Sequence, residues 1–234
     1  MKRAEELTRS VYTEVVYADG RVELGSCPVL RERELTVVSG GARLGQLTCT
    51  DTDLEELVLG WLYTQRLIDA AKEVKSIEIR NNHALVTLDG PDRAPTERRA
   101  VHKLPPAPDW SPENVFTLAR RFREGMPLHR RTGAAHSCFL MRAGAVVYAA
   151  EDVGRFNAVD KAVGYALRQG IPLGECLLYT SGRVSATLVE KLAAAGVPVL
   201  VSKAIPTAQA VSGARRRGMT LLCRAWEDRF ERFV

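Results

Sequence analysis

The second half of the chain alternates between short apolar segments and amphipathic helical segments, and this alternation limits its possible folds more than any other feature. The spacing predicts strands at 136–141, 145–150, 176–181, 197–202 and 219–223, with helices near 157–169, 185–195 and 207–217. Strand–helix–strand repetition with short connections predicts a mostly parallel sheet with helices on both faces. The first two strands are predicted as an antiparallel hairpin that turns through Arg142, Ala143 and Gly144.

Residues 12–90 show an α+β pattern instead. Strands are predicted at 11–17 and 34–38, and a hairpin of strands 74–80 and 83–88 around Asn81-Asn82. Thr52 and Glu55 have the spacing of a capping box, so a helix is predicted from there to about residue 67.

A proline-rich stretch separates the two patterns. Residues 89–110 hold five of the eleven prolines together with many charges, which is typical of a linker or mobile loop. A helix then begins with Ser111 as its N-cap and Pro112 in its first turn. The chain is therefore predicted to have two domains: an α+β domain over 1–110, with the loop at 89–110, and an α/β domain over 111–234.

Composition excludes several classes of protein. No apolar run approaches the ~20 residues of a membrane helix, and the first ten residues lack the apolar core of a secretory signal, so we expect a cytoplasmic protein. The net charge of +5 is mild. The five cysteines are widely spaced and form no C-x-x-C, which argues against a zinc site or a disulfide framework and favours a reducing compartment.

Polar segments follow three of the predicted strands, at 151–157, 181–183 and 202–207. Ligands of open α/β sheets lie beyond the carboxyl ends of the parallel strands, and helix N-termini there favour anions. Gly182 leaves room for a phosphate beside the backbone, and Arg155, Arg183 and Lys203 offer charged donors. Glu151 and Asp152 could accept hydrogen bonds from a sugar or base. The pattern predicts a site for a phosphate-bearing ligand, with a nucleotide as the leading candidate.

Several of these residues have alternative interpretations. Asn157 and Asp160 could form an N-cap pair for the following helix, and Arg155 could form an ion pair with Glu151 or Asp160. His136 could be structural, or it could lower the pKa of Cys138 two residues on and so activate a nucleophile. The other four cysteines are predicted to be buried packing residues.

Three segments, in this order and at these intervals, resemble the FdhD family of formate dehydrogenase accessory proteins. They are Thr132-Gly133-x-x-His136, the string EDVGR-x-NAVDK at 151–161, and Ser181-Gly182-Arg183. Weaker matches occur at 50–62, 206–207 and 219–222, so that the resemblance covers roughly residues 26–230.

The resemblance implies a cytoplasmic, dimeric sulfurtransferase, or sulfur carrier, that passes sulfur from a cysteine desulfurase to the molybdenum cofactor of formate dehydrogenase. It also implies binding of molybdopterin guanine dinucleotide, with guanosine diphosphate as an analogue, and a cytidine deaminase-like α/β/α domain without a directly bound metal. The loops and the resemblance together give these candidate cofactor-binding residues: Gly133, Glu151, Asp152, Arg155, Asn157, Asp160, Lys161, Ser181, Gly182, Arg183, Lys203, Thr207 and Arg229.

The chain departs from the family pattern where sulfur is carried. The family's Cys-Gly-x-Cys-Gly segment corresponds to residues 98–103 here, and no cysteine lies between Cys49 and Cys138. Phe156 replaces the usual histidine, Ala134 replaces a usual glycine, and the family's Pro-Gly-Arg segment is reduced to Arg229.

Two versions of the family function therefore stay open. The chain could transfer sulfur through another cysteine, with Cys138 as the candidate and His136 beside it, or it could bind the dinucleotide without transferring sulfur, which we favour. Whether it is an enzyme, and whether the metal is molybdenum or tungsten, stays undecided. The competing class is an α/β enzyme acting on a small nucleotide, with Glu151 or Asp152 as base and His136 as acid. Nucleic-acid binding is disfavoured because the aromatic residues, 6% of the chain, are dispersed.

Overall fold

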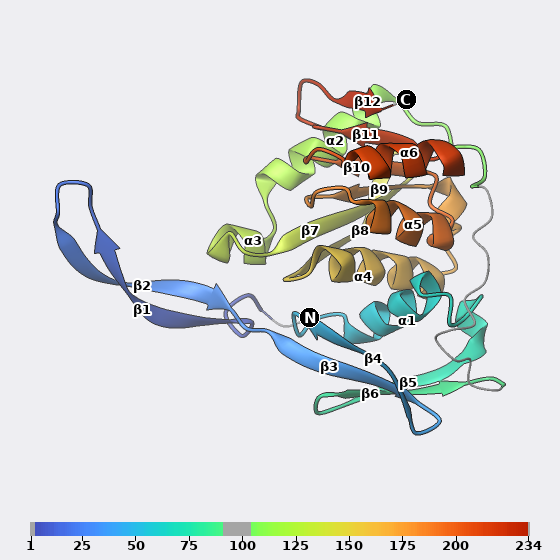
Figure 1. Cartoon of the computed structure of the whole chain (residues 1–234), viewed down its shortest axis with the longest axis horizontal. Helices are drawn as coiled ribbons and strands as arrows, with labels where there is room; N and C mark the ends of the chain where they lie inside the picture. The colour runs from blue at the N-terminus through green and yellow to red at the C-terminus, as the bar shows by residue number, and fades with distance from the viewer. Residues whose placement is uncertain (1–2, 91–103, 234) are drawn as a thin grey trace.

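The computed structural model describes residues 3–90 and 104–233, and its C-terminal half is built on one six-stranded sheet (Figure 1). The strand order is β12-β11-β10-β9-β7-β8, with parallel pairing from β9 to β11 and antiparallel pairing elsewhere. The bounds are β7 (His136–Arg142), β8 (Ala145–Asp152), β9 (Cys176–Thr180), β10 (Val199–Ser202), β11 (Thr220–Cys223) and β12 (Glu231–Phe233). The predicted parallel core and the β7–β8 hairpin are confirmed, with the turn at Ala143 and Gly144, both of positive φ.

Helices cover both faces of this sheet. The helices α4 (Arg155–Arg168), α5 (Ala186–Ala195) and α6 (Ala208–Arg217) share one apolar core with inward residues such as Leu140, Leu178 and Leu200. On the opposite face, α2 (Pro112–Glu124) packs on Phe139, Tyr179 and Val201. The predicted α/β/α layering is confirmed. The short helix α3 (Pro127–Thr132) and strand β12 were not predicted, because they are too short to show a period.

The N-terminal half contains a four-stranded sheet in the order β4-β3-β6-β5, beneath helix α1 (Leu54–Thr64). Its strands are β3 (Arg33–Ser39), β4 (Ala42–Cys49), β5 (Val74–Arg80) and β6 (His83–Leu88). The β5–β6 hairpin is confirmed over the predicted residues, with Asn81 at φ 49°. Strand β4 was not predicted. Two short 3₁₀ helices, Ala71–Glu73 and Leu173–Glu175, precede β5 and β9.

Helices α1 and α4 pack backbone against backbone, and this contact joins the two halves (Figure 1). A Cβ atom added at Gly60 would lie 1.9 Å from the carbonyl oxygen of Asp160, and one added at Gly164 would lie 1.9 Å from that of Glu56. Only glycine permits this approach, so each helix presents a glycine to the other.

Two predicted helix starts are wrong. Helix α1 has Asp53 as its N-cap, at φ 48° and without a side-chain cap, because the hydroxyl of Thr52 accepts a hydrogen bond from Lys161 instead. Helix α4 has Gly154 as its N-cap, so Asn157 lies inside the first turn. The N-cap at Ser111 is confirmed, with a capping box to Asn114.

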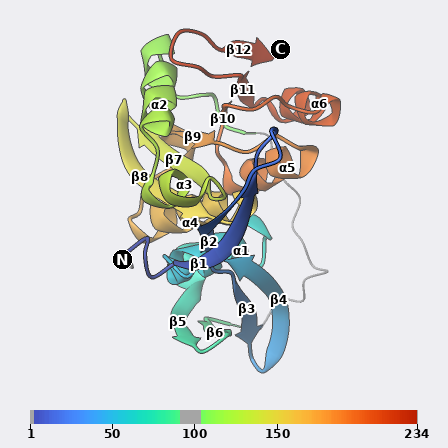
Figure 2. The same ribbon diagram turned by 90° about the vertical axis from the view of Figure 1, so that its left-hand side faces the viewer.

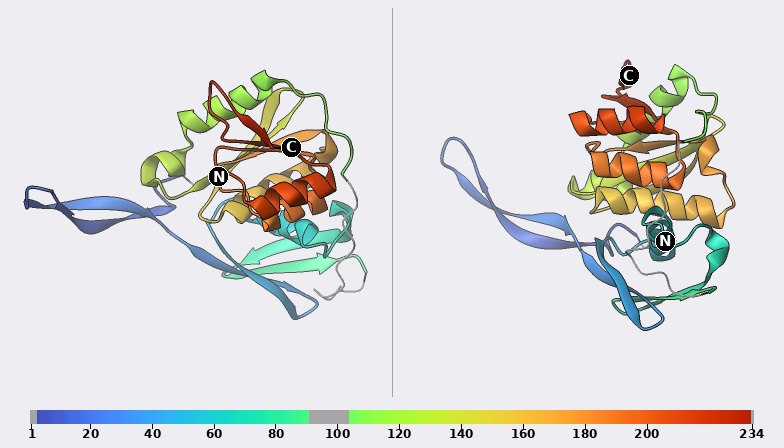
Figure 3. Two further views of the ribbon diagram at one scale, coloured as in Figure 1. Left: turned by 45° about the horizontal axis from the view of Figure 1, so that its top comes forward. Right: turned by 45° about the vertical axis from the view of Figure 1, so that its right-hand side comes forward.

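Strands β1 (Thr8–Val16) and β2 (Val22–Leu30) form a separate antiparallel ribbon that extends away from the body (Figures 1 and 3). Only part of β1 was predicted, and β2 was not, because Gly25 and Pro28 interrupt its strand pattern. Of the predicted loop at 89–110, residues 91–103 lie outside the described residues, while Leu104 is buried and donates its amide to Arg217. Within 3–90 and 104–233, no helix has the length and apolar character needed to cross a membrane.

Candidate functional site

The three polar loops meet at one edge of the six-stranded sheet, as predicted. Strands β8, β9 and β10 all end there, and β7 begins there. The Ser181 hydroxyl oxygen accepts the amide of Ser137 at 3.0 Å, and the Ser202 hydroxyl donates to the carbonyl of Gly182 at 2.9 Å. The loop at 181–183 is thus hydrogen-bonded both to the start of β7 and to the loop that begins at Ser202.

The string EDVGRFNAVDK supplies a buried ion pair that faces the N-terminal half. Lys161 Nζ lies 2.7 Å from Asp152 Oδ2, and both side chains are 0% exposed. Asp152 also accepts the backbone amides of Thr50 and Gly154, at 3.1 and 2.9 Å. Lys161 donates to the Thr52 hydroxyl at 3.0 Å. The pair is therefore fully hydrogen-bonded, as a buried pair must be to be tolerated.

Asn157 joins the same cluster. Its side-chain amide donates to Asp152 Oδ1 at 2.9 Å and to the carbonyl of Thr48 at 2.7 Å. The bond to Asp152 is buried, and Thr48 belongs to the N-terminal half.

A second buried pair involves Asp160, which directly precedes Lys161 in α4. Lys191 Nζ is 2.7 Å from both carboxylate oxygens of Asp160, and the Thr64 hydroxyl donates to Asp160 at 2.8 Å. Burial raises the pKa of Asp160, and the charge of Lys191 opposes that rise. Sequence reasoning missed Lys191, because it lies on the apolar side of α5 and 31 residues from its partner.

These residues form what we call the interdomain network: Asp152, Asn157, Asp160, Lys161 and Lys191, with Thr48, Thr50, Thr52 and Thr64 of the N-terminal half. Four of its members were predicted to contact a cofactor. The structure gives all four internal partners, and none is more than 8% exposed. Direct contact with a ligand through them stays a prediction, whereas the contacts observed hold the two halves together.

Glu151 is also engaged by the protein. Its two carboxylate oxygens accept the backbone amides of Leu128 and His129, at 2.8 and 2.7 Å, and it thereby caps α3. Burial raises the pKa of Glu151, and the two amides oppose that rise. With both Glu151 and Asp152 engaged, no free carboxylate base is found for the small-nucleotide enzyme among the residues proposed for it.

Arg155 and Gly182 form the centre of the edge. A Cβ atom at Gly182 would lie 2.8 Å from Arg155 Cδ, so glycine is needed for the arginine side chain to lie across this loop. The guanidinium carbon sits 4.8 Å from the ring centroid of Phe156. Among the described residues, the buried Arg155 Nε has no hydrogen-bond partner. An unsatisfied buried donor of this kind is typical of a site that receives a polar ligand.

His136 borders this centre. Its Nδ1 lies 3.3 Å from the hydroxyl oxygen of Ser181. The pKa of His136 is lowered, first by burial and then by the positive charge of Arg155. At neutral pH the ring is therefore uncharged.

The cysteines correct two expectations. Cys138 is 0% exposed and packs in the core under α4, where burial raises its pKa, so it is not the accessible thiolate that a sulfur carrier needs. Burial likewise raises the pKa of Cys49 and Cys223 to about 12 and that of Cys176 to about 11. Cys27, predicted to be buried, is exposed on β2.

The outer part of the edge is aromatic and basic. Lys203 Nζ lies 5.0 Å from the ring centroid of Phe122 and 5.5 Å from that of Trp226. Trp226 is 42% exposed, and sequence reasoning missed it because only the long-range contact with Lys203 marks it. Arg183 is exposed beside Gly182. Together Arg155, Ser181, Gly182, Arg183, Lys203 and Trp226 form what we call the ligand edge.

The remaining candidates lie around its border. The Thr207 hydroxyl oxygen accepts the Ala210 amide and caps α6, which leaves its proton available to a ligand. Gly133 is the C-cap of α3, at φ 66°. Arg229 is exposed and pairs with Asp228 at 3.0 Å, while its carbonyl accepts the Trp226 amide.

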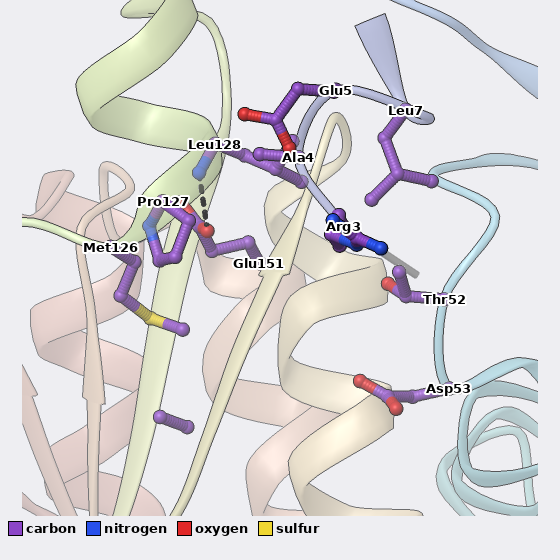
Figure 4. Close-up of a pocket in the computed structure, with 11 residues that line it drawn as sticks. Arg3, Ala4, Glu5, Leu7, Thr52, Asp53, Met126, Pro127, Leu128 and Glu151 are labelled. Carbon is purple, nitrogen blue, oxygen red and sulfur yellow. Dashed lines mark hydrogen bonds between the residues drawn. The ribbon is translucent and has the colours of Figure 1, made fainter. Parts of the chain in front are cut away.

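A separate cavity of about 300 Å³ lies behind Glu151, between the N-terminal segment, the start of α1 and α3 (Figure 4). Leu7, Met126 and Ala149 are among its apolar lining residues. In Figure 4 the carboxylate of Glu151 points to Leu128 at its border. Arg155 and Gly182 do not line this cavity, so it is distinct from the ligand edge.

The fold matches that of a known class of protein. The crystal structure of a formate dehydrogenase accessory protein from Desulfotalea psychrophila superposes with a TM-score of 0.83 at 25% identity, covering 97% of this chain and 96% of that chain. The molecule thus has the fold of a formate dehydrogenase accessory protein.

The family follows from the sequence comparisons. The FdhD/NarQ family model matches residues 30–234, so the chain belongs to the FdhD/NarQ family, as the three motifs predicted. Similar proteins include the sulfur carrier protein FdhD of Bordetella parapertussis, 30% identical over 222 residues (83% of this chain, 80% of that protein). That of Halalkalibacterium halodurans is 28% identical over 218 residues (82% and 81%).

Proposed function

We propose that this chain serves formate dehydrogenase maturation by binding molybdopterin guanine dinucleotide at the ligand edge. The observation that carries the proposal is the position of Arg155, which is held over Gly182 with a buried Nε that no atom of the described residues satisfies. A guanidinium donor in such a place is matched by a phosphate oxygen.

The rest of the ligand edge suits the other parts of such a ligand. Arg183 and Lys203, which follow the carboxyl ends of β9 and β10, add two positive charges to the ligand edge. The exposed ring of Trp226 offers a surface on which a purine base can stack, a contact worth about 1–3 kcal/mol. Guanosine diphosphate therefore represents the half of the cofactor that this edge would hold.

The burial of four of the five cysteines supports a role in binding the cofactor over a role in which this chain carries sulfur on its own thiol. The four buried cysteines have raised pKa values or lie in the core, and only the thiolate is the nucleophile in sulfur exchange. Sulfur would then come from a thiol of a partner such as a cysteine desulfurase. The alternative version uses Cys27, the one exposed cysteine of the five.

Calorimetric titration with guanosine diphosphate tests the binding proposal. We expect saturable binding by the wild-type protein, weakened roughly 10-fold or more in Arg183→Ala and Arg155→Ala, because a hydrogen bond to a charged group contributes about 1.5–3 kcal/mol. Arg142→Ala is the matched control, since Arg142 ends β7 at the opposite edge of the sheet and pairs with exposed Glu175. No binding up to millimolar nucleotide would overturn the proposal.

Intact-mass measurement separates the two versions of the function. After incubation with a cysteine desulfurase and cysteine, we expect no species heavier by about 32 Da, the mass of one persulfide sulfur. Such a species in the wild-type protein, lost in Cys27→Ser, would establish the carrier version instead.

A further inference from the structure

Helix α4 lies between helix α1 of the N-terminal half and strands β7 and β8 (Figures 1 and 2). It begins at Arg155, whose side chain lies across Gly182 at the ligand edge. Only Val153 and Gly154 separate Arg155 from Asp152 at the end of β8. The conformation of this short turn therefore sets the direction in which the Arg155 side chain leaves the backbone.

Hydrogen bonds fix this turn against the N-terminal half. The Val153 amide donates to the Thr50 hydroxyl oxygen at 3.0 Å, and the Gly154 amide donates to Asp152 Oδ1 at 2.9 Å. Asp152 in turn accepts the Thr50 amide through Oδ2 at 3.1 Å. Both backbone amides between β8 and Arg155 thus have fixed partners.

Asn157, in the first turn of α4, joins the two sides of this contact. Its Nδ2 donates to Asp152 Oδ1 at 2.9 Å and to the carbonyl oxygen of Thr48 in β4 at 2.7 Å. The two bonds use both hydrogens of the side-chain amide, and the residue is only 8% exposed. The donors of Asn157 are therefore engaged within the protein.

The Asn157 side chain also packs on the turn itself. A Cβ atom added at Gly154 would lie 2.9 Å from Asn157 Nδ2, which is too close, so the two residues are in direct contact. Gly154 has a φ of −99°, which alanine adopts without strain. It is therefore the contact with Asn157, and not the backbone conformation, that favours glycine here.

The other observed contacts of the Arg155 side chain have little directionality. Its guanidinium carbon lies 4.8 Å from the Phe156 ring centroid, and its methylene groups lie against Gly182. Apolar contacts are less directional than hydrogen bonds, and Nε has no hydrogen-bond partner among the described residues. The backbone at the start of α4 therefore decides where Nε lies.

We propose that Asn157 is a positioning residue that fixes Arg155 at the ligand edge through Asp152 and Gly154. A displacement of the N-terminal half moves the Thr48 carbonyl, and Asn157 transmits that displacement to the turn before Arg155. A binding group has to be held within about 0.5 Å and 10–20° of its productive geometry. The consequence for cofactor binding rests on the proposed function, whereas the position of Arg155 can be measured without a ligand.

The rate at which the Arg155 Nε–H proton exchanges with solvent, measured by NMR, tests the proposal. The absence of this signal in Arg155→Ala assigns it. We expect slow exchange in the wild type, since Nε is buried, and exchange roughly 10-fold or more faster in Asn157→Ala. Gly154→Ala, whose Cβ would displace the Asn157 amide, should show the same effect and decides the question if Asn157→Ala fails to fold.

Thr64→Val is the matched control. Thr64 belongs to the same interdomain network, but its hydroxyl bonds to Asp160 and Lys191 and not to the turn before Arg155. We expect Thr64→Val to lower the thermal transition, as Asn157→Ala does, and to leave the exchange of the Arg155 proton unchanged.

Slow exchange that persists in both Asn157→Ala and Gly154→Ala would overturn the proposal, because an Asn157 that only joins the two halves would affect stability alone. Fast exchange in the wild type, or an equal acceleration in Thr64→Val, would overturn it as well.

Guanosine diphosphate should bind to Asn157→Ala roughly 10-fold more weakly than to the wild type or to Thr64→Val. Equal binding by all three proteins would overturn the consequence for the ligand. If none of them binds the nucleotide, the proposed function fails, while proton exchange still decides whether Asn157 positions Arg155.

Discussion

Two residues of the motif, Asp152 and Lys161, form a buried ion pair at the contact between the two halves. Two fully buried charges are tolerated because every remaining polar atom of the pair has a partner, and several of those partners belong to the N-terminal half. Such a pair contributes little net free energy compared with apolar residues, but removal of one partner leaves an uncompensated charge.

Lys161→Met should therefore lower the free energy of unfolding by about 3–5 kcal/mol, because Asp152 would remain buried without its counter-charge. Urea denaturation measures this loss. Arg142→Ala, which breaks the exposed pair with Glu175, is the control and should cost less than about 1 kcal/mol. Equal losses in the two variants would contradict the role of the buried pair.

The pKa of the His136 imidazole depends on the neighbouring Arg155. Burial and Arg155 lower its pKa below 6.5, so Arg155→Ala should raise it, and NMR titration of the imidazole measures the change. An unchanged pKa in Arg155→Ala would show that the guanidinium does not act on the ring.

The lowered pKa of His136 also makes the stability of the folded protein depend on pH. The unfolded chain takes up a proton near pH 6.5 that folded His136 resists, so its contribution to stability is present above that pH and is lost as the pH falls through the lowered pKa of the folded state. His136→Gln should remove this part of the pH dependence.

For single residues, the sequence motifs predicted which positions matter better than what each side chain contacts. EDVGRFNAVDK identified the family, but the direction in which each side chain points depends on how α1 packs on α4. Asp152, Asp160 and Lys161 turn to the N-terminal half while Arg155 stays at the sheet edge. Trp226 and Lys191 have partners far along the chain, so no local pattern revealed them.

Among the elements, α1 and α4 make the closest contact between the two halves. Gly60 and Gly164 allow each helix to touch the carbonyl oxygens of the other. The sequence shows these glycines inside helical patterns but not the helix that each one meets.

Gly60→Ala should destabilise the protein by about 3 kcal/mol or more, because its Cβ would overlap the backbone of Asp160, which cannot move without displacing α4. Chemical denaturation measures the change. Gly213→Ala is the control, since its Cβ would meet Val189 at an ordinary 3.6 Å and alanine is the better helix former. A neutral Gly60→Ala would contradict the close packing of α1 and α4.

Element prediction succeeded where a local pattern was sufficient. The β5–β6 hairpin and the parallel strands β9 to β11 have clear turn or alternation signals. Strand β2 is exposed on both faces and contains Gly25 and Pro28. Its sequence therefore lacks the alternation that predicts a strand, and only its pairing with β1 reveals it.

In the whole molecule, the interdomain network and the α1–α4 contact hold the N-terminal half against helix α4. The ligand edge lies at the carboxyl ends of β9 and β10, where Arg183 and Trp226 are exposed. The fold and the membership in a family of formate dehydrogenase accessory proteins were predictable from three short motifs. The division of those motifs between ligand edge and interdomain network required the tertiary structure.

The most direct test of the central claim is formate dehydrogenase activity in the native host after deletion of the gene for this chain. We expect activity to be lost while the dehydrogenase polypeptide is still made, and to be restored by the wild-type gene. A gene carrying Arg155→Ala and Arg183→Ala, expressed at the same level, should not restore it, whereas Arg142→Ala should. Full restoration by the double variant, or undiminished activity after the deletion, would contradict the proposed role of the ligand edge.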